Sequence, residues 1–325
     1  MKNKVLLCFD YDLTSGYGHL SRTEVFFDAL PKDLYQVFIL TEIDPILQKL
    51  DFTFLKDVIW IDIDKAKQMS FDLAYLDTYS EKSLIDFESI LAKNKVLLVD
   101  SNFQGNLPCW ANLVIVLEQA LIRYSDHEIQ VVSGLTLIKD RIKNTRTKRQ
   151  EIYSIKSKPL VAIVNFGGSL QSKPHLFNLK STFLRNRDLQ YKVYCAEELI
   201  PFLLNEFEYI ENVTLMAIGN SYYDELITSD FLITSSGTSF LEALYIDIPI
   251  VLFNLYESAQ LNFTRFRSES TVLYSGESAD LIKKWQSAVT SKLNSTYLEF
   301  RNAKSESDIS FLDSKQLFLA ISNLK

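Results

Sequence analysis

Residues 230–253 have the sequence DFLITSSGTSFLEALYIDIPIVLF, which contains a strand, a loop of small residues, a helix and a second strand. The runs DFLITSSG and IPIVLF are apolar and rich in β-branched residues, as is typical of strands that are buried on both faces. Between them, the small residues from Ser235 to Ser239 lead into the helix. A strand, a helix and another buried strand in succession indicate an α/β fold with a parallel sheet.

The same alternation continues from this stretch toward both ends of the chain. Strand-like runs occur at 4–10, 35–40, 57–62, 71–77, 94–100, 112–118, 159–169, 189–196, 212–219 and 271–276. Amphipathic helical stretches, such as 19–30 and 81–93, lie between these runs. We therefore expect two doubly wound, Rossmann-like domains, in which ligands bind in a central cleft beside the carboxyl ends of the strands.

The domain limits follow from composition. The 325-residue chain is long enough for two domains, and the segment 139–159 carries eight Lys or Arg against two acidic residues. We expect an N-terminal domain at 1–140, a charged linker at 141–158, and a C-terminal domain at 159–325 with a helical tail from about 277. A solvated linker is the favoured interpretation of the basic segment, and contact with an anionic membrane surface is the alternative.

Composition also restricts the function. The net charge of −7 argues against a nucleic-acid-binding protein, because phosphate neutralisation needs a basic face. No apolar run approaches the roughly 18 residues of a transmembrane span, and the start MKNKVLLCFDYD reaches acidic residues too early for a signal peptide. We therefore expect a cytoplasmic protein. Cys8, Cys109 and Cys195 lie far apart in apolar contexts, which predicts reduced core thiols and no metal site.

The loop after the first strand, TSGYGHLSR at 14–22, gathers scarce residues. Gly16 and Gly18 allow the backbone to approach a ligand closely, and His19 lies near the start of a helix. The helix dipole favours a neutral imidazole there, and such an imidazole can act as a general base. Alternatively, the glycines form a tight turn and His19 caps the helix.

Two further strand ends in the first half carry acidic residues. FDLAYLDTY ends in Asp77 and Tyr79, and KVLLVDSNF contains Asp100. Asp77 can orient His19 or bind a substrate hydroxyl, and its alternative role is to cap the next helix. His127 and His175 have no motif around them, so we expect both to be surface or structural residues.

The second half contains three candidate loops. In NFGGS, Gly167, Gly168 and Ser169 can present backbone N–H groups to a phosphate, although a plain turn is an equal alternative. In SSGTS, the residues Ser235, Ser236, Gly237, Thr238 and Ser239 surround a helix N-terminus. Glu242 follows one turn later and can bind a ribose diol; the alternative is a Ser/Thr N-cap with Glu242 in a capping box. Gln260 and, less strongly, Asn262 can enter the same cleft, or lie on a surface helix.

These motifs in this order resemble the GT-B superfamily, and most closely its PseG/SpsG-type UDP-sugar hydrolases of the pseudaminic acid pathway. The resemblance spans about residues 4–275 and is most specific in GYGHLSR. It implies a UDP-sugar site, at which the glycine- and serine-rich loops at 167–169 and 235–239 approach the diphosphate, Glu242 binds the ribose and Gln260 contributes. It further implies that His19, Asp77 and Tyr79 are catalytic. The residues assigned to the other substrate contacts are Gly16, Tyr17, Gly18, Arg22 and Asp100.

The resemblance favours a metal-independent hydrolase that releases UDP from an activated amino or deoxy sugar, for synthesis of surface glycans or nonulosonic acids. A GT-B glycosyltransferase with the same donor site, acting on a sugar or a lipid-linked hydroxyl, is the alternative. A nucleotide-sugar-binding protein without catalysis is a third interpretation. In each case no cofactor beyond the nucleotide sugar is expected.

Overall fold

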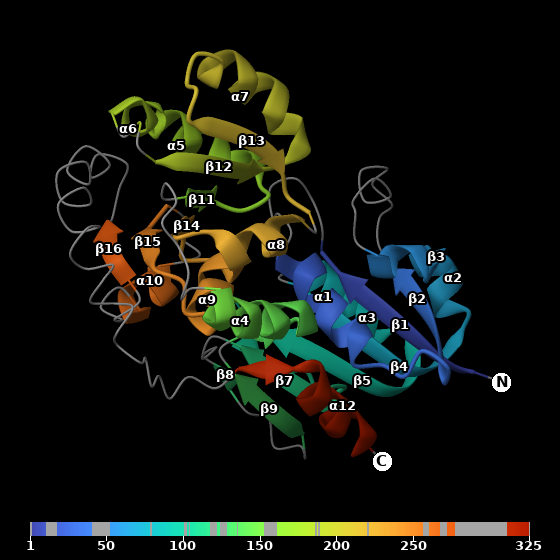
Figure 1. Cartoon of the computed structure of the whole chain (residues 1–325). Helices are drawn as coiled ribbons and strands as arrows, with labels where there is room; N and C mark the ends of the chain where they lie inside the picture. The colour runs from blue at the N-terminus through green and yellow to red at the C-terminus, as the bar shows by residue number, and fades with distance from the viewer. Residues whose placement is uncertain are drawn as a thin grey trace. The chain divides into compact units, whose positions relative to one another are not determined.

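The protein consists of two compact units, Met1–Asp140 with Ile309–Lys325 and Arg141–Asp308. The computed structural model in Figure 1 describes residues 2–10, 18–40, 53–78, 80–100, 103, 105–117, 122–123, 129–134, 136–152, 161–185, 187, 189–219, 221–255, 260–266, 272–276 and 311–324. Each unit is built on one parallel sheet. The two are described in turn.

The sheet of unit 1 has seven parallel strands in the order β3-β2-β1-β4-β5-β7-β9. Its strands are β1 (Asn3–Phe9), β2 (Tyr35–Leu40), β3 (Ile59–Ile61), β4 (Ser70–Asp77), β5 (Leu91–Val99), β7 (Leu113–Leu117) and β9 (Gln130–Gly134). The helices are α1 (Gly18–Asp28), η2 (Thr53–Lys56), α2 (Ile63–Lys67), α3 (Glu81–Glu88) and α12 (Ser314–Ser322). Short strand pairs are formed by β6 (Gly105–Asn106) with β8 (Ile122–Arg123), and by β10 (Leu137–Ile138) with β17 (Leu312–Asp313).

Alternate residues of each central strand enter different cores. In β1, Val5 and Leu7 belong to one buried cluster, whereas Leu6 and Cys8 belong to another. Successive side chains of a strand point to opposite faces, so both faces of this sheet are covered, as a doubly wound fold requires. On the first face, the ring of Phe26 from α1 stacks on Tyr75 of β4 with centroids 4.1 Å apart.

The C-terminal helix belongs to unit 1, and the expected domain 159–325 is wrong in this respect. Strand β17 pairs with β10 in parallel, with Leu312 opposite Leu137. Helix α12 has a capping box at Asp313, and its residues Leu317 and Ala320 are buried in the same core as β1. Burial of this apolar face decides where the tail packs, and no local pattern in the sequence identifies that partner.

The sheet of unit 2 has six parallel strands in the order β13-β12-β11-β14-β15-β16. They are β11 (Val161–Asn165), β12 (Gln190–Cys195), β13 (Val213–Ala217), β14 (Phe231–Ser235), β15 (Ile250–Phe253) and β16 (Val272–Gly276). The helices are α4 (Asp140–Ile152), η3 (Leu170–Ser172), α5 (Lys173–Asn178), α6 (Lys180–Arg185), η4 (Glu197–Leu199), α7 (Ile200–Phe207), α8 (Ser221–Thr228), α9 (Thr238–Tyr245) and α10 (Gln260–Phe266). This 3-2-1-4-5-6 order is that of a dinucleotide-binding fold, and the first six strands of the main sheet of unit 1 repeat it.

The basic segment predicted to be a solvated linker is a packed helix over much of its length. In α4, Ile142, Thr145 and Arg149 lie on one face at helical spacing and are buried. The guanidinium of Arg149 donates to the carbonyl oxygens of Leu226 (2.9 Å) and Ser229 (2.5 Å), at the C-terminal end of α8. Arginine at a helix C-terminus satisfies carbonyl groups that have no partner within the helix, which explains why so charged a segment packs.

The thiols only partly follow expectation. All three cysteines are free, and Cys8 and Cys195 are buried as predicted, but Cys109 is exposed. Burial, with a smaller effect of Glu198, raises the pKa of Cys195 to about 12.

Half-buried His175 packs its ring edge-on against Phe166, in agreement with a structural role, whereas His127 lies outside the described residues. In the part of the chain that the structure describes, no helix is long and apolar enough to cross a membrane.

We predict that Arg149→Ala destabilises the protein by about 1–3 kcal/mol, because two buried carbonyl groups lose a charged donor. Urea unfolding of the purified protein measures the effect. Lys148→Ala changes an exposed residue of the same helix and serves as the control. Equal stability of the two variants would contradict the packing of α4 described above.

Candidate functional site

The strand order of unit 1 reverses between β1 and β4. These neighbours pair in parallel, with Phe9 opposite Asp77, so that Asp10 and Asp77 lie at the same edge of the sheet. Asp100 follows β5, the next strand along, and α1 begins at Gly18. In doubly wound folds, ligands bind outside the carboxyl ends of the strands at this switch point. The predicted residues His19, Asp77 and Asp100 therefore converge on one edge.

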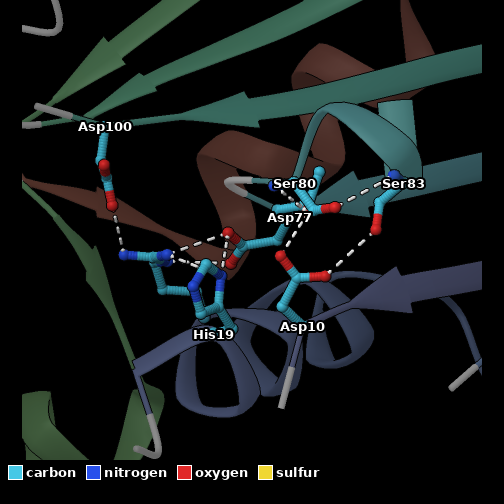
Figure 2. A network of polar contacts seen from close by, with 8 residues as sticks. Asp10, His19, Asp77, Ser80, Ser83 and Asp100 are labelled. Carbon is cyan, nitrogen blue, oxygen red and sulfur yellow. Dashed lines mark hydrogen bonds and ion pairs between the residues drawn. The ribbon is translucent and has the colours of Figure 1, made fainter. Parts of the chain in front are cut away.

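Four side chains form a buried polar group at this edge, which we call the His19 cluster: His19, Arg22, Asp77 and Asp100 (Figure 2). The Nδ1 atom of His19 lies 2.6 Å from Oδ1 of Asp77. Arg22 donates from Nε to Oδ2 of Asp77 and from Nη2 to Oδ1, each at 2.9 Å. Its Nη1 donates to Oδ2 of Asp100, also at 2.9 Å. Arg22 therefore joins a carboxylate at the end of β4 to one directly after β5.

The short distance to Asp77 decides the tautomer of His19. If Nδ1 carried a lone pair, it would face an ionised carboxylate oxygen at 2.6 Å, and two acceptors repel at that distance. Nδ1 therefore carries the proton and donates it to Asp77, although Nη2 of Arg22 also lies 3.1 Å away. In this tautomer Nε2 bears the lone pair. An imidazole oriented by a carboxylate in this way can accept a proton at Nε2.

Asp77 stays ionised although it is fully buried. Burial alone raises the pKa of a carboxyl group, but the charge of Arg22, the contact with His19 and their hydrogen bonds outweigh it and lower the pKa of Asp77 to about 2. With neutral His19, one guanidinium and two carboxylates give the cluster a net charge of −1. Proton uptake by His19 brings this sum to zero, so the cluster offsets the imidazolium charge that forms during base catalysis.

The structure separates the two interpretations of Asp77. The N-cap of α3 is Ser80, so the helix-capping alternative is wrong, and the predicted contact between Asp77 and His19 is present. Arg22 and Asp100 were predicted to bind substrate, but their charged groups pair with each other and are buried. Gly18 is the first residue of α1, whereas Gly16, Tyr17 and Tyr79 lie outside the described residues.

Sequence analysis did not single out Asp10, although it ends the first strand-like run. Its carboxylate accepts hydrogen bonds from Thr78 Oγ1 and from Ser83 Oγ (3.4 Å), and its backbone N–H donates to the carbonyl of Asp77 (Figure 2). Thr78 also accepts from the backbone N–H of Ser80 at 2.9 Å. Asp10 therefore joins the end of β1 to the start of α3. The sequence did contain a signal for Asp10, because this residue follows a buried strand directly, in the run CFD.

Unit 2 has its own switch point between β11 and β14, which also pair in parallel. Asn165 ends β11 and joins the two predicted loops: its Oδ1 accepts from the N–H of Gly167 (2.8 Å), and its Nδ2 donates to Oγ of Ser239 (3.1 Å). Gly167 has φ +95°, a conformation that side chains with a Cβ rarely adopt. The structure thus brings the 167–169 and 235–239 loops together, through an asparagine that sequence analysis did not predict.

The N-terminus of α9 differs from the capping alternative. The N-cap is Gly237, which has no side chain to bond the first turn, and the N3 residue is Phe240 instead of a glutamate. The Ser/Thr N-cap with a capping box is therefore wrong. A first turn whose N–H groups are not capped by an N-cap side chain is suited to an anion. Glu242 follows in the helix, is buried, and accepts a hydrogen bond from Tyr223 Oη (3.1 Å) at Oε1.

The remaining predicted residues of unit 2 follow β11 and β15 at the same sheet edge. Gly168 is buried, and Ser169 caps η3 by accepting from the N–H of Gln171, so that part of the loop is an ordinary capped turn. Gln260 begins α10 after β15, is exposed, and contacts Asn254 and Thr264 (3.2 Å). The side chain of Asn262 lies outside the described residues.

A separate open pocket of about 760 Å³ lies in unit 1, at the amino ends of β1, β2 and β3. Lys2, Lys4, Lys32 and Asp57 line it, together with apolar residues such as Phe27. The His19 cluster occupies the carboxyl ends of the strands, so this pocket is not part of it. Among the described residues, no three His, Cys, Asp or Glu side chains are placed to hold a metal ion.

No protein-family model and no curated protein matches this sequence. Solved structures do match the whole chain at low sequence identity. The chain has the GT-B fold.

The structure of Acinetobacter baumannii MurG has a TM-score of 0.60 and 10% identity, with 98% of this chain and 99% of that chain covered. Anabaena HepE in complex with UDP-glucose has a TM-score of 0.57 and 13% identity, covering 99% and 95%. Phytolacca americana UGT2, complexed with UDP-2-fluoro-glucose and pterostilbene, has a TM-score of 0.57 and 11% identity, covering 99% of both chains. The α/β fold predicted from sequence is confirmed.

We predict that Asp77 contributes stability that depends on pH. Its pKa is lowered from 3.8 to about 2 in the folded protein, so the contribution is complete above the unfolded value and is lost as the pH falls from about 4 through 2. This shift corresponds to about 2 kcal/mol. In urea unfolding, the destabilisation by Asp77→Asn is expected to shrink by that amount between pH 5 and pH 2.

Asp33→Asn removes an exposed carboxylate of the same unit and is the control. If the loss in free energy of unfolding caused by Asp77→Asn stayed constant from pH 5 to pH 2, Arg22 and His19 would not be holding this carboxylate ionised.

Proposed function

We propose that the protein is a glycosyltransferase that transfers a sugar from a UDP-sugar to a hydroxyl group, with His19 as the general base. The observation that carries the proposal is the His19–Asp77 contact at the switch point of a GT-B fold, which leaves the lone pair of His19 on Nε2. The neighbours HepE and UGT2, each with a bound UDP-sugar, support this class of donor. The acceptor is a sugar or lipid-linked hydroxyl.

We propose that unit 2 binds the donor. The N–H groups of the first turn of α9, near Gly237, Thr238 and Ser239, receive the diphosphate, and the helix dipole adds to the attraction. The loop at Gly167 and Gly168 is joined to this turn by Asn165 and approaches the same phosphates. Glu242, one turn further on, accepts hydrogen bonds from the ribose. In this proposal the charge of the leaving group is met by N–H groups, without a metal ion.

The proposed reaction has a complete proton balance. Nε2 of His19 takes the proton from the acceptor hydroxyl, and the acceptor oxygen forms a bond to the anomeric carbon. The bond from that carbon to the β-phosphate oxygen breaks, and UDP leaves with the electron pair. Asp77 and Arg22 keep the imidazole oriented, and the cluster offsets the imidazolium charge.

Hydrolysis is the second candidate, since water in place of the acceptor requires the same base and the same donor site. The motif GYGHLSR and its order relative to NFGGS and SSGTSFLE favour it, because they resemble the UDP-sugar hydrolases. A binding protein without catalysis is the third. Incubation with UDP-sugars, with and without sugar or lipid-linked acceptors, separates them: UDP release that requires the acceptor supports transfer, and release in water alone supports hydrolysis.

We predict that His19→Ala lowers the rate of UDP release by about 10²- to 10⁴-fold, as expected for loss of a general base, while UDP binding is retained. A coupled UDP-release assay and isothermal titration calorimetry measure the two quantities. Lys82→Ala, an exposed position on α3, is the control. Full activity of His19→Ala would exclude it as the base.

We predict that Gly237→Ala weakens UDP binding by about tenfold or more without changing the melting temperature. A Cβ at this position meets no atom within 4 Å in the protein itself, so folding tolerates it, but the added methyl group stands where a diphosphate approaches the backbone. Tenfold corresponds to about 1.4 kcal/mol. Thr228→Ala, at the exposed end of α8, is the control. Unchanged UDP affinity would place the diphosphate elsewhere.

A further inference from the structure

Helix α4 contacts α8, which precedes β14 in the chain, and the end of α9, which follows β14. Arg141 places its guanidinium carbon 4.2 Å from the ring centre of Tyr223 in α8. Arg146 pairs with Asp247 (3.1 Å), directly beyond α9, and lies over the ring of Tyr245. With Arg149, which caps α8, three arginines of α4 hold α8 and α9. The basic segment therefore contacts the helices that carry Tyr223 and Glu242.

Tyr223 is the link between α4 and Glu242. Its hydroxyl group donates to Oε1 of Glu242 at 3.1 Å, and both side chains are buried, with 9% and 3% of their surface exposed. A hydrogen bond from a neutral donor to a carboxylate is among the stronger ones in a protein, because the acceptor is charged. It restrains rotation of the carboxylate group about its last side-chain bond. The plane in which Glu242 accepts further hydrogen bonds is therefore set by Tyr223.

Arg141 in turn restrains the ring of Tyr223. A guanidinium 4.2 Å above an aromatic ring is attracted by the negative face of that ring, and the attraction strengthens when both groups are withdrawn from water. The ring of Tyr222 also packs against Tyr223 in an edge-on arrangement, with centroids 5.2 Å apart. Burial and then the nearby charge of Glu242 raise the pKa of Tyr222. Tyr223 is thus in contact with both Arg141 and Tyr222.

We propose that Tyr223, with its ring held by Arg141, orients the Glu242 carboxylate so that it accepts hydrogen bonds from both ribose hydroxyls of the donor nucleotide. Tyr223 and Arg141 are positioning residues, because they act through Glu242. The inference rests on the proposed function, in which unit 2 binds UDP. It adds a specificity for ribose over deoxyribose, because a carboxylate with a fixed plane loses one defined bond when the 2′-hydroxyl is missing.

The test compares binding of UDP and 2′-deoxy-UDP by isothermal titration calorimetry. We expect the full-length protein to bind UDP about 10- to 100-fold more tightly than 2′-deoxy-UDP, the range for one hydrogen bond to a charged group. In Tyr223→Phe, which keeps the ring and removes only the donor, we expect this ratio to fall below about threefold. Glu242→Gln should lower it similarly. Tyr209→Phe removes the hydroxyl of a tyrosine that is 84% exposed, and should leave the ratio unchanged.

If Tyr223 had a purely structural role, Tyr223→Phe would weaken the binding of UDP and of 2′-deoxy-UDP equally, and the ratio of the two affinities would not change. An unchanged ratio in this variant therefore overturns the inference. The proposed function is upheld separately, by UDP binding to the unaltered protein. An unchanged ratio in Glu242→Gln overturns the ribose assignment, and the inference with it. Absence of UDP binding by the unaltered protein overturns both. Arg141→Ala, which removes the cation from the ring, is the second variant in case Tyr223→Phe does not fold. Its ratio is expected to fall while its melting temperature stays within a few degrees, and an unchanged ratio overturns the inference.

Discussion

Asp77 is a carboxylate buried at the centre of a parallel sheet edge, and Arg22 is the group that allows it to remain charged there. An isolated buried carboxylate would take up a proton, because its desolvation costs several kcal/mol. The two bonds from Arg22, at 2.9 Å each, prevent this, and Asp100 balances the other side of the guanidinium. The tautomer of His19, and with it the basic Nε2 atom, depends on this charge. Loss of Arg22 would leave the buried carboxylates of Asp77 and Asp100 without their shared positive partner.

The two units carry different types of side chain at the switch points of their sheets, which share one strand order over six strands. In unit 1, helix α1 and the end of β4 are joined by the carboxylate of Asp77, which pairs with Arg22 and contacts His19. In unit 2, the loops after β11 and β14 are joined by the neutral amide of Asn165. A charged cluster suits proton transfer, whereas neutral groups around a helix N-terminus suit an anion that brings its own charge. The proposed function assigns the base to unit 1 and the donor to unit 2 in accordance with this difference.

Sequence reasoning placed the candidate residues at the sheet edges because they follow strands that a local apolar pattern reveals. His19, Asp77, Gly167 and Gly237 were all found in this way, and each lies at the expected sheet edge. Arg22 and Asp100 were also found, but they were assigned to substrate instead of to each other, since their pairing joins residues 78 positions apart. Asn165 and Tyr223 were missed, because an amide at a strand end and a tyrosine in a helix are common and carry no motif.

The sequence by itself determined the order of strands and helices, the α/β class and the loops that carry the candidate chemistry, because hydrophobic periodicity and glycine placement act over a few residues. Tertiary structure alone decided three matters: that α12 packs on unit 1, that the basic run 140–152 is a docked helix, and which partner each charged group takes. Each depends on burying an apolar face or a charge against residues distant in the chain. That free energy has no local signature in the sequence.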